Sequence, residues 1–167
     1  MTRSLARPLR IVQAAAFPFP SAQGSQVYVR GMARALARRG HEVMVVCYGH
    51  GEGEVDSDYR VVRTPKLPGY NNLRAGPDWV KPGLDIALAA KIASLPADIV
   101  HAHNYEAPIA AFLAQRFTGT PIVYSAHNTM REELPTYFAG RLSRSLARSA
   151  GTLLDRTVPR MAEHAVV

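Results

Sequence analysis

The chain has 167 residues, enough for one domain that buries roughly 70% of the surface its unfolded form exposes. Hydrophobic residues make up 47% and charged residues 20%, a composition typical of globular proteins rather than of disordered or fibrous ones. The formal net charge of +7 favours an anionic partner. The aromatic and basic residues are not interleaved as in a groove for single-stranded nucleic acid, so we predict no nucleic-acid partner. No apolar run reaches the roughly eighteen residues of a membrane span, and the single cysteine, Cys47, cannot form an internal disulfide, which favours a cytoplasmic protein.

The amino-terminal part of the chain alternates between apolar strands and an amphipathic helix. A strand is predicted over Leu9–Ala15 and a second over Glu42–Tyr48, in which Cys47 is expected to be buried and inert. Gly40 ends the helix between them. The apolar face of this helix comprises Val29, Met32, Ala33, Leu36 and Ala37, and the opposite face carries Arg30, Arg34 and Arg38.

Residues 49–80 are rich in Gly, Pro, Asn and Asp, with one short strand candidate at Tyr59–Arg63, and such long irregular stretches are often functional loops. Regular elements then resume with the helix Pro82–Leu95, the strand Asp98–His103, the helix Ile109–Phe117 and the strand Pro121–Ala126. One face of the third helix carries Ile109, Ala110, Leu113, Ala114 and Phe117. Two more helices are predicted over Thr129–Ser149 and Thr152–Glu163, and Ala165–Val167 has the character of another strand, as expected for the first part of a longer protein.

This alternation predicts an α/β fold: a doubly wound, Rossmann-like parallel sheet in a three-layer α/β/α domain over residues 1–167. Ligands of such sheets bind beyond the carboxyl ends of the strands. The candidate ends are the loop Phe17–Gln26 and the segments His101–Glu106 and Ser125–Thr129. The first loop has neither the dinucleotide nor the phosphate-loop motif, so Gly24 either opens an anion site at a helix start or is an ordinary turn residue.

Histidines dominate the other two strand ends. His101 and His103 alternate along a strand, so their side chains should point to the same side of the sheet. With His127 and Glu106 they match the residue types of a zinc site, which makes a metal-dependent hydrolase one alternative, although hydrogen-bonded histidines are commoner at strand ends. His127 begins a polar turn, where an imidazole can act as an acid, a base or a hydrogen-bond donor near neutral pH.

An acidic pair of residues and a basic segment follow this turn. Glu132 and Glu133 open the next helix, where the helix dipole favours negative charge. A basic amphipathic segment follows, with Arg141, Arg144 and Arg148 on one face and Leu142 and Leu146 on the other. Solvent is the commoner neighbour of such a face, and an anionic membrane surface on the inner side of the cell membrane is the alternative.

In order along the chain, three segments resemble the amino-terminal domain of family-4 retaining glycosyltransferases. They are the stretch Arg10–Tyr48, with its Phe-Pro-Phe-Pro loop, Gly24 and Arg39-Gly40-His41-Glu42-Val43; the strand Asp98–His103; and the Tyr-Ser-Ala-His-Asn sequence at residues 124–128. The resemblance implies one half of a GT-B architecture, in which two Rossmann-like domains face each other across a cleft. It further implies metal-independent, retaining transfer of a sugar from a nucleotide-sugar donor to a saccharide, lipid or small-metabolite acceptor, with no cofactor besides the donor.

The same resemblance implies roles for individual residues. His127 is expected to be catalytic, beside the reacting sugar. Substrate binding is expected of Gln23, Gly24, Ser25, His103, Asn104, Glu106 and Asn128. The first loop departs from the family pattern, because Ala22-Gln23-Gly24 stands where many members have two adjacent glycines. The carboxyl-terminal, donor-binding domain lies outside these 167 residues, so we expect little transfer by the chain alone, and a non-catalytic module for a sugar or lipid head group is a further alternative.

Overall fold

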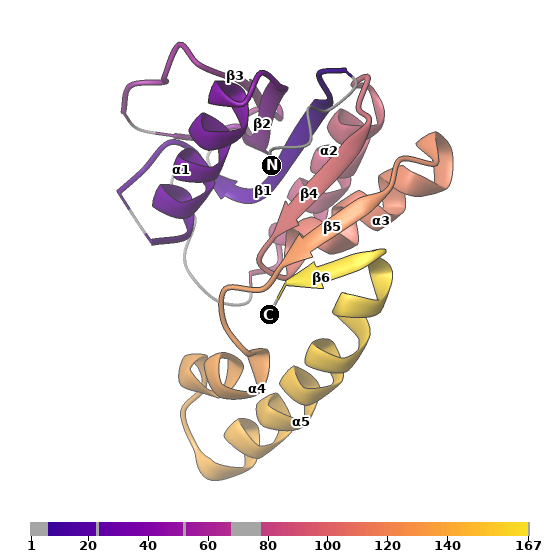
Figure 1. Cartoon of the computed structure of the whole chain (residues 1–167). Coiled ribbons are helices and arrows are strands. Elements are labelled where there is room, and N and C mark those ends of the chain that lie inside the picture. The colour runs from indigo at the N-terminus through magenta and orange to yellow at the C-terminus, as the bar shows by residue number, and fades with distance from the viewer. Residues whose placement is uncertain (1–6, 23, 52, 68–77, 167) are drawn as a thin grey trace.

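The computed structural model describes residues 7–22, 24–51, 53–67 and 78–166. Six parallel strands form one sheet in the order β3-β2-β1-β4-β5-β6 (Figure 1). This order is that of the doubly wound Rossmann type, with its reversal point between β1 and β4, and it confirms the predicted fold class. The strands are β1 (Arg10–Pro18), β2 (Glu42–Tyr48), β3 (Arg60–Arg63), β4 (Ile99–His103), β5 (Ile122–Ser125) and β6 (His164–Val166).

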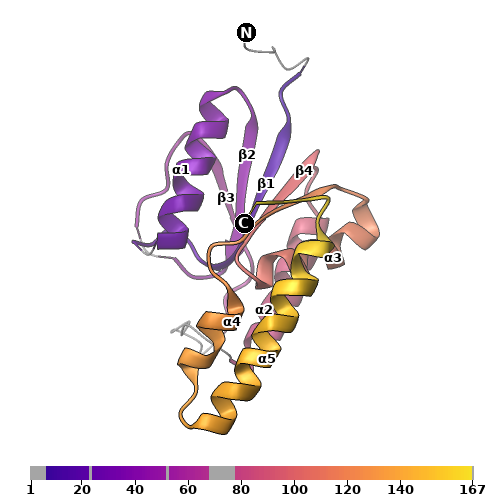
Figure 2. The ribbon, with the colours of Figure 1, turned by 60° about the horizontal axis from the view of Figure 1, so that its bottom comes forward.

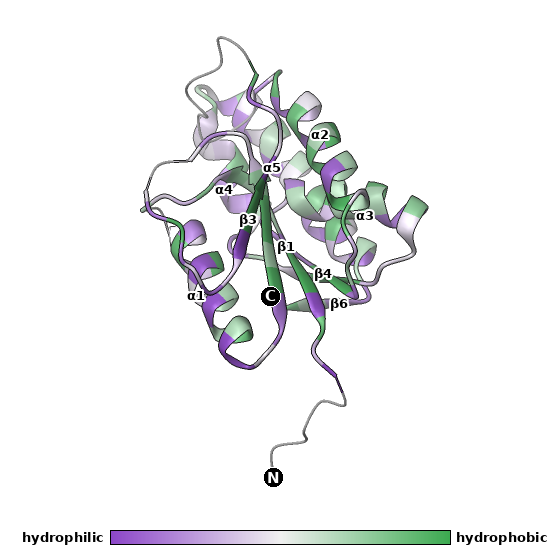
Figure 3. Cartoon of the chain, turned by 90° about the horizontal axis from the view of Figure 1, so that it is seen from above, coloured by the Kyte–Doolittle hydropathy of each residue, from purple (hydrophilic) through white to green (hydrophobic). Residues whose placement is uncertain are grey.

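Helices cover both faces of the sheet, whose central strands are mostly hydrophobic (Figure 3). Helix α1 (Gly24–Arg38) lies on one side, and α2 (Lys81–Ala93) and α3 (Glu106–Thr118) lie on the other (Figure 2). Under α1 the buried side chains include Ala15, Val29, Val43, Val45 and Cys47. Under α2 and α3 they include Val12, Ala14, Met44, Val46, Leu84, Leu88 and Ala102. Residues of opposite parity on β1 and β2 therefore fill two separate cores, as the period of two requires.

The buried face of α3 shares Ala110 and Ala114 with the predicted one but otherwise differs from it. Its buried stripe consists of small residues at helical spacing, and the large apolar residues Leu113 and Phe117 are 43% and 86% exposed. The buried residues are Pro108 and the alanines Ala107, Ala110, Ala111 and Ala114. Alanines allow α2 and α3 to approach closely over the sheet, so packing distance rather than side-chain size selects the inward face.

The two long helices predicted after β5 were wrong in their boundaries. The chain forms the short α4 (Met130–Glu133), a 3-10 turn at Leu134–Tyr137, the long α5 (Arg141–Thr157) and a second 3-10 turn at Val158–Met161. Pro135 lies in the first turn, and Gly140, with φ of 93°, opens α5. Gly151, which the prediction placed between helices, is inside α5, where a Cβ atom would come within 2.3 Å of the Met130 carbonyl oxygen. This close contact requires glycine and holds α4 against α5.

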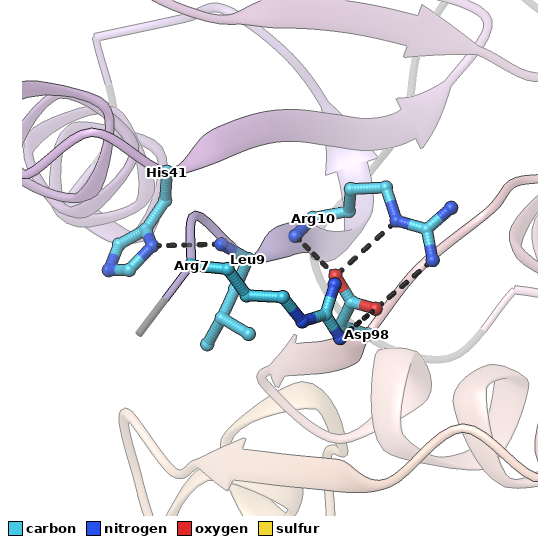
Figure 4. Close-up of polar contacts among 5 residues, drawn as sticks. All are labelled: Arg7, Leu9, Arg10, His41 and Asp98. Carbon is cyan, nitrogen blue, oxygen red and sulfur yellow. Dashed lines mark hydrogen bonds and ion pairs between the residues drawn. The ribbon is translucent and has the colours of Figure 1, made fainter. Parts of the chain in front are cut away.

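Ion pairs and hydrogen bonds fasten the amino ends of β1 and β4 (Figure 4). Asp98 accepts hydrogen bonds from the Arg10 backbone N–H at 2.8 Å and from the guanidinium groups of Arg10 at 3.0 Å and Arg7 at 3.2 Å. His41 accepts a hydrogen bond from the Leu9 backbone N–H at its Nδ1, at 3.3 Å. The histidine of the Arg-Gly-His-Glu-Val segment therefore joins two strands at the edge of the sheet opposite the predicted site.

Residues near the end of the chain form β6, which pairs in parallel with β5 and confirms the strand predicted there. Cys47 is buried as expected, and burial raises the pKa of its thiol to about 12. Among the described residues, no helix is long and apolar enough to cross a membrane.

Candidate functional site

The three histidines of the predicted site meet at the carboxyl ends of β4 and β5. The ring centroids of His101 and His103 are 4.3 Å apart, which confirms that both side chains lie on the same face of the sheet. The ring of His127, which comes two residues after β5 ends, is 5.5 Å from that of His103. Because parallel strands end at the same edge, residues 24 positions apart in sequence become neighbours.

A glutamine that the sequence analysis did not select connects these histidines. Gln13 lies in the middle of β1 and is fully buried, and in the register of the sheet it is opposite His101. Its Oε1 is 2.6 Å from Nε2 of His103, and its Nε2 is 3.4 Å from Nδ1 of His101. The available signal was a lone amide in an otherwise apolar strand, since a buried amide needs hydrogen-bond partners.

Hydrogen bonds extend this network at both ends. Nδ1 of His103 is 3.3 Å from Nε2 of His127, and Nε2 of His101 is 2.8 Å from Oγ of the buried Ser125. We define the histidine network as Gln13, His101, His103, Ser125 and His127. Four of its five members come from the three central strands β1, β4 and β5, so a rigid scaffold positions its polar atoms.

Burial keeps the imidazoles of the histidine network neutral near pH 7. The pKa of His103 lies well below 6.5 because the ring is buried and because His101 and His127 are close. Burial, together with His127, lowers the pKa of His101 to about 4. The pKa of His127 is lowered by burial as well. Neutral imidazoles each carry one N–H and one lone pair, so this network can both donate and accept hydrogen bonds.

Helix α1 contributes an aromatic ring to the same place. The ring of Tyr28, in the second turn of α1, stands edge-on to His127 at 4.8 Å between centroids and to His103 at 5.9 Å. The start of α1 therefore lies beside the histidines, together with Gly24 and Ser25 of the predicted set. Gln23 lies outside the described residues. Tyr28 was also missed by the sequence analysis, because a tyrosine in a helix has no distinctive pattern of its own.

The turn after β5 is fastened from three directions. The Tyr105 hydroxyl donates to the Asn128 carbonyl oxygen and accepts from the Met130 N–H at 2.9 Å. Asp155 of α5 accepts a hydrogen bond from the Met130 N–H at 2.8 Å, and its Oδ1, 2.9 Å from the Tyr105 hydroxyl oxygen, shares the single proton of that hydroxyl with the Asn128 carbonyl oxygen. His127 is thus held by a turn that α3, α4 and α5 fix together.

The remaining predicted residues have other partners. The Asn128 amide donates to Glu133 at 2.9 Å, so this side chain stabilises the start of α4. Glu106 opens α3 and forms an ion pair at 3.1 Å with Lys81, the first residue of α2, which lies on the sheet face opposite α1. Asn104, with φ of 62°, makes the left-handed turn between β4 and α3. The structure brings His103 and His127 together but gives no contact of Glu106 or the Asn128 side chain with them.

The histidine network does not fit the zinc site that the hydrolase alternative requires. Both ring nitrogens of His101 and of His103 are in hydrogen bonds with protein groups, and the lone pairs do not converge on one point. Within the described parts of the chain, no group of three or more His, Cys, Asp and Glu side chains is arranged to hold a metal ion. The geometry is that of a hydrogen-bonded cluster.

Solved structures with the same fold include a sucrose-phosphate synthase and a starch synthase. A sucrose-phosphate synthase from Thermosynechococcus elongatus superposes with a TM-score of 0.70 at 15% identity, over 95% of this chain and 42% of that protein. The catalytic domain of starch synthase IV from Arabidopsis thaliana, bound to ADP and acarbose, gives 0.58 at 17% identity, over 74% and 34%. Anabaena HepE, in complex with UDP and glucose, gives 0.56 at 14% identity, over 94% and 37%.

These likenesses establish the fold, and the chain spans about two fifths or less of the length of these proteins. No curated protein matches the sequence. The sequence does match the family model of Glycosyltransferase Family 4 over residues 22–163, which include α1 and both histidine-bearing strand ends. The chain therefore belongs to Glycosyltransferase Family 4 and has the Rossmann-like fold of one half of a GT-B glycosyltransferase.

Proposed function

We propose that the protein transfers a sugar from a nucleotide-sugar donor to a saccharide, lipid or small-metabolite acceptor with retention of configuration, and that residues 1–167 form its acceptor-side domain. The observation that carries this proposal is the position of His127. It is a half-buried imidazole at the carboxyl edge of the sheet, beside His103 and the first turns of α1. This edge is where open parallel sheets bind ligands.

The beginning of α1 supports a role in binding the donor diphosphate. A Cβ atom built on Gly24 would meet no atom within 4 Å, so packing among the described residues does not explain a glycine there. A missing side chain leaves the N–H groups at the start of this 15-residue helix open to an anion, which the helix dipole favours. We propose that Gln23, Gly24 and Ser25 approach the donor phosphates or the acceptor.

Sugar transfer also requires a surface that binds the donor, on the other side of the active-site cleft. We propose that a second Rossmann-like domain supplies it and that the 167-residue chain alone transfers little sugar. We further propose that catalysis needs no metal ion and no cofactor besides the nucleotide sugar. In that case the leaving diphosphate is stabilised by helix N–H groups and basic side chains. Chelation with EDTA should leave the transfer rate unchanged, and loss of transfer that zinc or magnesium restores would contradict this part of the proposal.

The decisive experiment compares two histidine variants of the full-length protein. Nucleotide release from UDP-, GDP- and ADP-linked hexoses identifies a donor, and NMR of the product reports its anomeric configuration. His127→Ala should lower kcat/KM about 100-fold or more while donor affinity changes only a few-fold. His164→Ala, on the exposed β6, is the matched control and should retain full activity. Normal turnover by His127→Ala would remove His127 from the mechanism.

Binding without transfer would favour the non-catalytic alternative. If no nucleotide sugar is turned over, while NMR titration detects binding of a saccharide or lipid head group at the carboxyl edge of the sheet, the domain recognises sugars without reacting them. An inverted product would contradict the retaining chemistry but leave the transferase function intact.

We also propose that α5 rests on an anionic membrane surface. Its leucines Leu142, Leu146 and Leu153 are 76%, 64% and 62% exposed and fall on one stripe of the helix. Three arginines of the same helix are also exposed, Arg156 beside the stripe and Arg141 and Arg148 on the face away from it. Arg144 donates its Nε to the Phe138 carbonyl oxygen at 2.9 Å. Exposed apolar and cationic side chains on one helix complement the acyl boundary and the head groups of an anionic bilayer.

Vesicle flotation tests this surface. The protein should float with vesicles containing phosphatidylglycerol, in a salt-sensitive manner, and not with pure phosphatidylcholine vesicles. The double variant Leu142→Ser with Leu146→Ser should lose binding, while Phe117→Ser, which alters an 86% exposed residue of α3, should retain it. Equal binding to both lipids, or none, would contradict the membrane proposal.

A further inference from the structure

The buried amide of Gln13 is the only group in the histidine network that combines a fixed donor with a fixed acceptor. Its Oε1 can only accept a hydrogen bond and its Nε2 can only donate. It is fully buried, with Val12 and Ala14 facing the opposite core, so its hydrogen bonds are made within the network. The direction of its bonds therefore constrains which nitrogen of each neighbouring histidine carries the proton.

The constraint passes from Gln13 to His127 in two steps. Oε1 of Gln13 lies 2.6 Å from Nε2 of His103, so that nitrogen must carry a hydrogen. A buried, neutral His103 then has its lone pair on Nδ1. That lone pair is 3.3 Å from Nε2 of His127, which must therefore be the donor and carry the hydrogen.

The nitrogen of the Gln13 amide determines in the same way which ring nitrogen of His101 carries the proton. Nε2 of Gln13 donates to Nδ1 of His101 at 3.4 Å, so the hydrogen of His101 is on Nε2. That hydrogen points to Oγ of Ser125 at 2.8 Å. All three histidines are thus in the Nε2–H form, set by one amide on the neighbouring strand.

From this geometry we propose that Gln13 is a positioning residue that acts through His103 to hold His127 in the Nε2–H tautomer, so that the unprotonated Nδ1 of His127 is presented to the substrate. Within residues 7–22, 24–51, 53–67 and 78–166, no protein group is hydrogen-bonded to Nδ1 of His127. A lone pair at this atom accepts a hydrogen bond from a hydroxyl group and repels phosphate oxygens. The group that His127 recognises is therefore a sugar hydroxyl of the donor or of the acceptor. The inference rests on the proposed function only in that His127 contacts the substrate.

Nitrogen-15 NMR of the histidine rings tests the tautomers without any assay of activity. In the wild-type protein at pH 7.5, long-range correlations between ring protons and ring nitrogens should identify His101, His103 and His127 as Nε2–H tautomers. The reversed amide orientation would instead put the proton of His103 on Nδ1. That result, or a His127 with its proton on Nδ1, would overturn the inference.

Variants of Gln13 separate positioning from packing. Gln13→Leu removes both hydrogen bonds and should leave His127 as a mixture of tautomers. In the full-length protein its kcat should fall about 10- to 100-fold, as expected when the orienting partner of a functional histidine is lost, while KM changes less than 3-fold. Gln13→Glu keeps an acceptor for Nε2 of His103 and should preserve the His127 tautomer. Its carboxylate should also raise the pKa of His103, whose ring faces His101, His127 and Tyr28, so the tautomer of this variant is measured above that pKa, where His103 is neutral.

Ser125→Ala is the matched control, because it breaks the network beyond His101 and leaves the bonds from Gln13 to His103 and His127 intact. It should keep the His127 tautomer, and His164→Ala, which lies outside the network, remains the control for activity. A wild-type His127 spectrum in a folded Gln13→Leu protein would overturn the inference. If Gln13→Leu does not fold, the wild-type tautomers and Gln13→Glu still decide it.

Two outcomes distinguish this inference from the proposed function. Nε2–H tautomers together with normal turnover by His127→Ala would contradict the role of His127 in transfer, but not the action of Gln13 on the network. The deoxy form of one substrate, the donor or the acceptor, should lower kcat/KM in the wild-type protein but not in His127→Ala, which identifies the hydroxyl that donates to His127. Equal wild-type kcat/KM values for the hydroxyl and deoxy forms of both substrates would contradict hydroxyl recognition.

Discussion

The two faces of β1 and β4 are made from alternate residues of the same strands, yet they differ in chemistry. Facing α2 and α3 are Val12, Ala14, Val100 and Ala102, all buried in a hydrocarbon core. Facing α1, near the carboxyl edge, are Gln13, His101 and His103, which are held by hydrogen bonds. Toward the amino ends the α1 face is apolar again, where Ile11 pairs with Ile99.

The difference between the two faces shows where in this fold polar side chains can be placed. A hydrocarbon face is stabilised by area and tolerates no unpaired polar atom, whereas a polar face requires a specific partner for each donor and acceptor. The α1 face of β4 and β5 has room for polar groups at the edge of the sheet, because the contacts of α1 with the sheet are centred on β1 and β2. The candidate site therefore lies where one core ends.

The largest effect is expected on the hydrocarbon face. Leu88→Ala removes a fully buried side chain of α2 and leaves a cavity, which should lower the free energy of unfolding by about 2–5 kcal/mol. Ile86→Ala, on the same helix but 64% exposed, is the control and should cost less than about 1 kcal/mol. Urea unfolding followed by circular dichroism measures both. Equal losses in the two variants would contradict the assignment of this face.

Replacing Gln13 and His103 by leucines should show that their contributions to the free energy of unfolding are coupled. Gln13→Leu and His103→Leu each leave a buried partner unpaired, so each should cost about 1–3 kcal/mol of unfolding free energy. The double variant removes both partners and should cost clearly less than the sum. Unfolding of all four proteins completes the cycle, and additivity within about 0.5 kcal/mol would mean that the two side chains do not act as a pair.

The two faces should also respond to acid in opposite directions. The pKa of His101 is lowered from 6.5 to about 4, so the unfolded chain binds a proton that the folded chain excludes, and stability is lost as the pH falls from about 6.5 to 4. On the α2 face, burial raises the pKa of Asp85 from 3.8 to about 6, so stability is gained as the pH falls from about 6 to 4.

Single variants separate these opposing contributions. Asp85→Asn should steepen the loss of stability between pH 6.5 and 4, and His101→Gln should flatten it, each by roughly 1–2 kcal/mol across that range. Urea midpoints between pH 4 and pH 7.5 provide the measurement. The ion-paired Asp98 has a lowered pKa and loses its contribution only below about pH 4, outside this range. A His101→Gln protein with an unchanged slope would contradict the burial of His101.

The last prediction concerns the reactivity of the Cys47 thiol, which lies in the core under α1. Burial raises the pKa of its thiol to about 12, so the folded protein should react with a thiol reagent at pH 8 at least about 100-fold more slowly than free cysteine. Denaturant should release one reactive thiol per chain. Rapid labelling of the folded protein would show that this part of the α1 face opens more readily than the packing implies.

Much of the fold could be predicted from the sequence because the period of the hydrophobic pattern and the residue composition change sharply from one element to the next. Every strand was found close to its observed position, and the glycine at 40 marked the end of α1. The helices after β5 were predicted less well, because Pro135, Gly140 and Gly151 have different roles that sequence alone does not separate. Gly151 is inside a helix because of its contact with Met130, a reason visible only in three dimensions.

The candidate site was predicted in part. His101, His103 and His127 stood out because a charged or polar residue at the end of an apolar strand is conspicuous. Glu106 stood out for the same reason, yet its partner is Lys81 on the opposite face. Gln13 and Tyr28 were missed, since their importance depends on neighbours from other elements. The roles of Gln23, Gly24, Ser25, Asn104 and Asn128 toward substrate remain predictions.

By itself the sequence determined the α/β class, the order of strands along the chain and the histidine-bearing strand ends. These follow from local hydrophobic periodicity and turn residues, which act over a few positions. Only the tertiary structure decided which side chains meet. The register of β1 against β4 brings Gln13 beside His101 and His103, and the contact of α5 with α4 helps to fix the turn that carries His127. A hydrogen bond depends on tenths of an ångström between strands far apart in sequence, and no local pattern specifies such a distance.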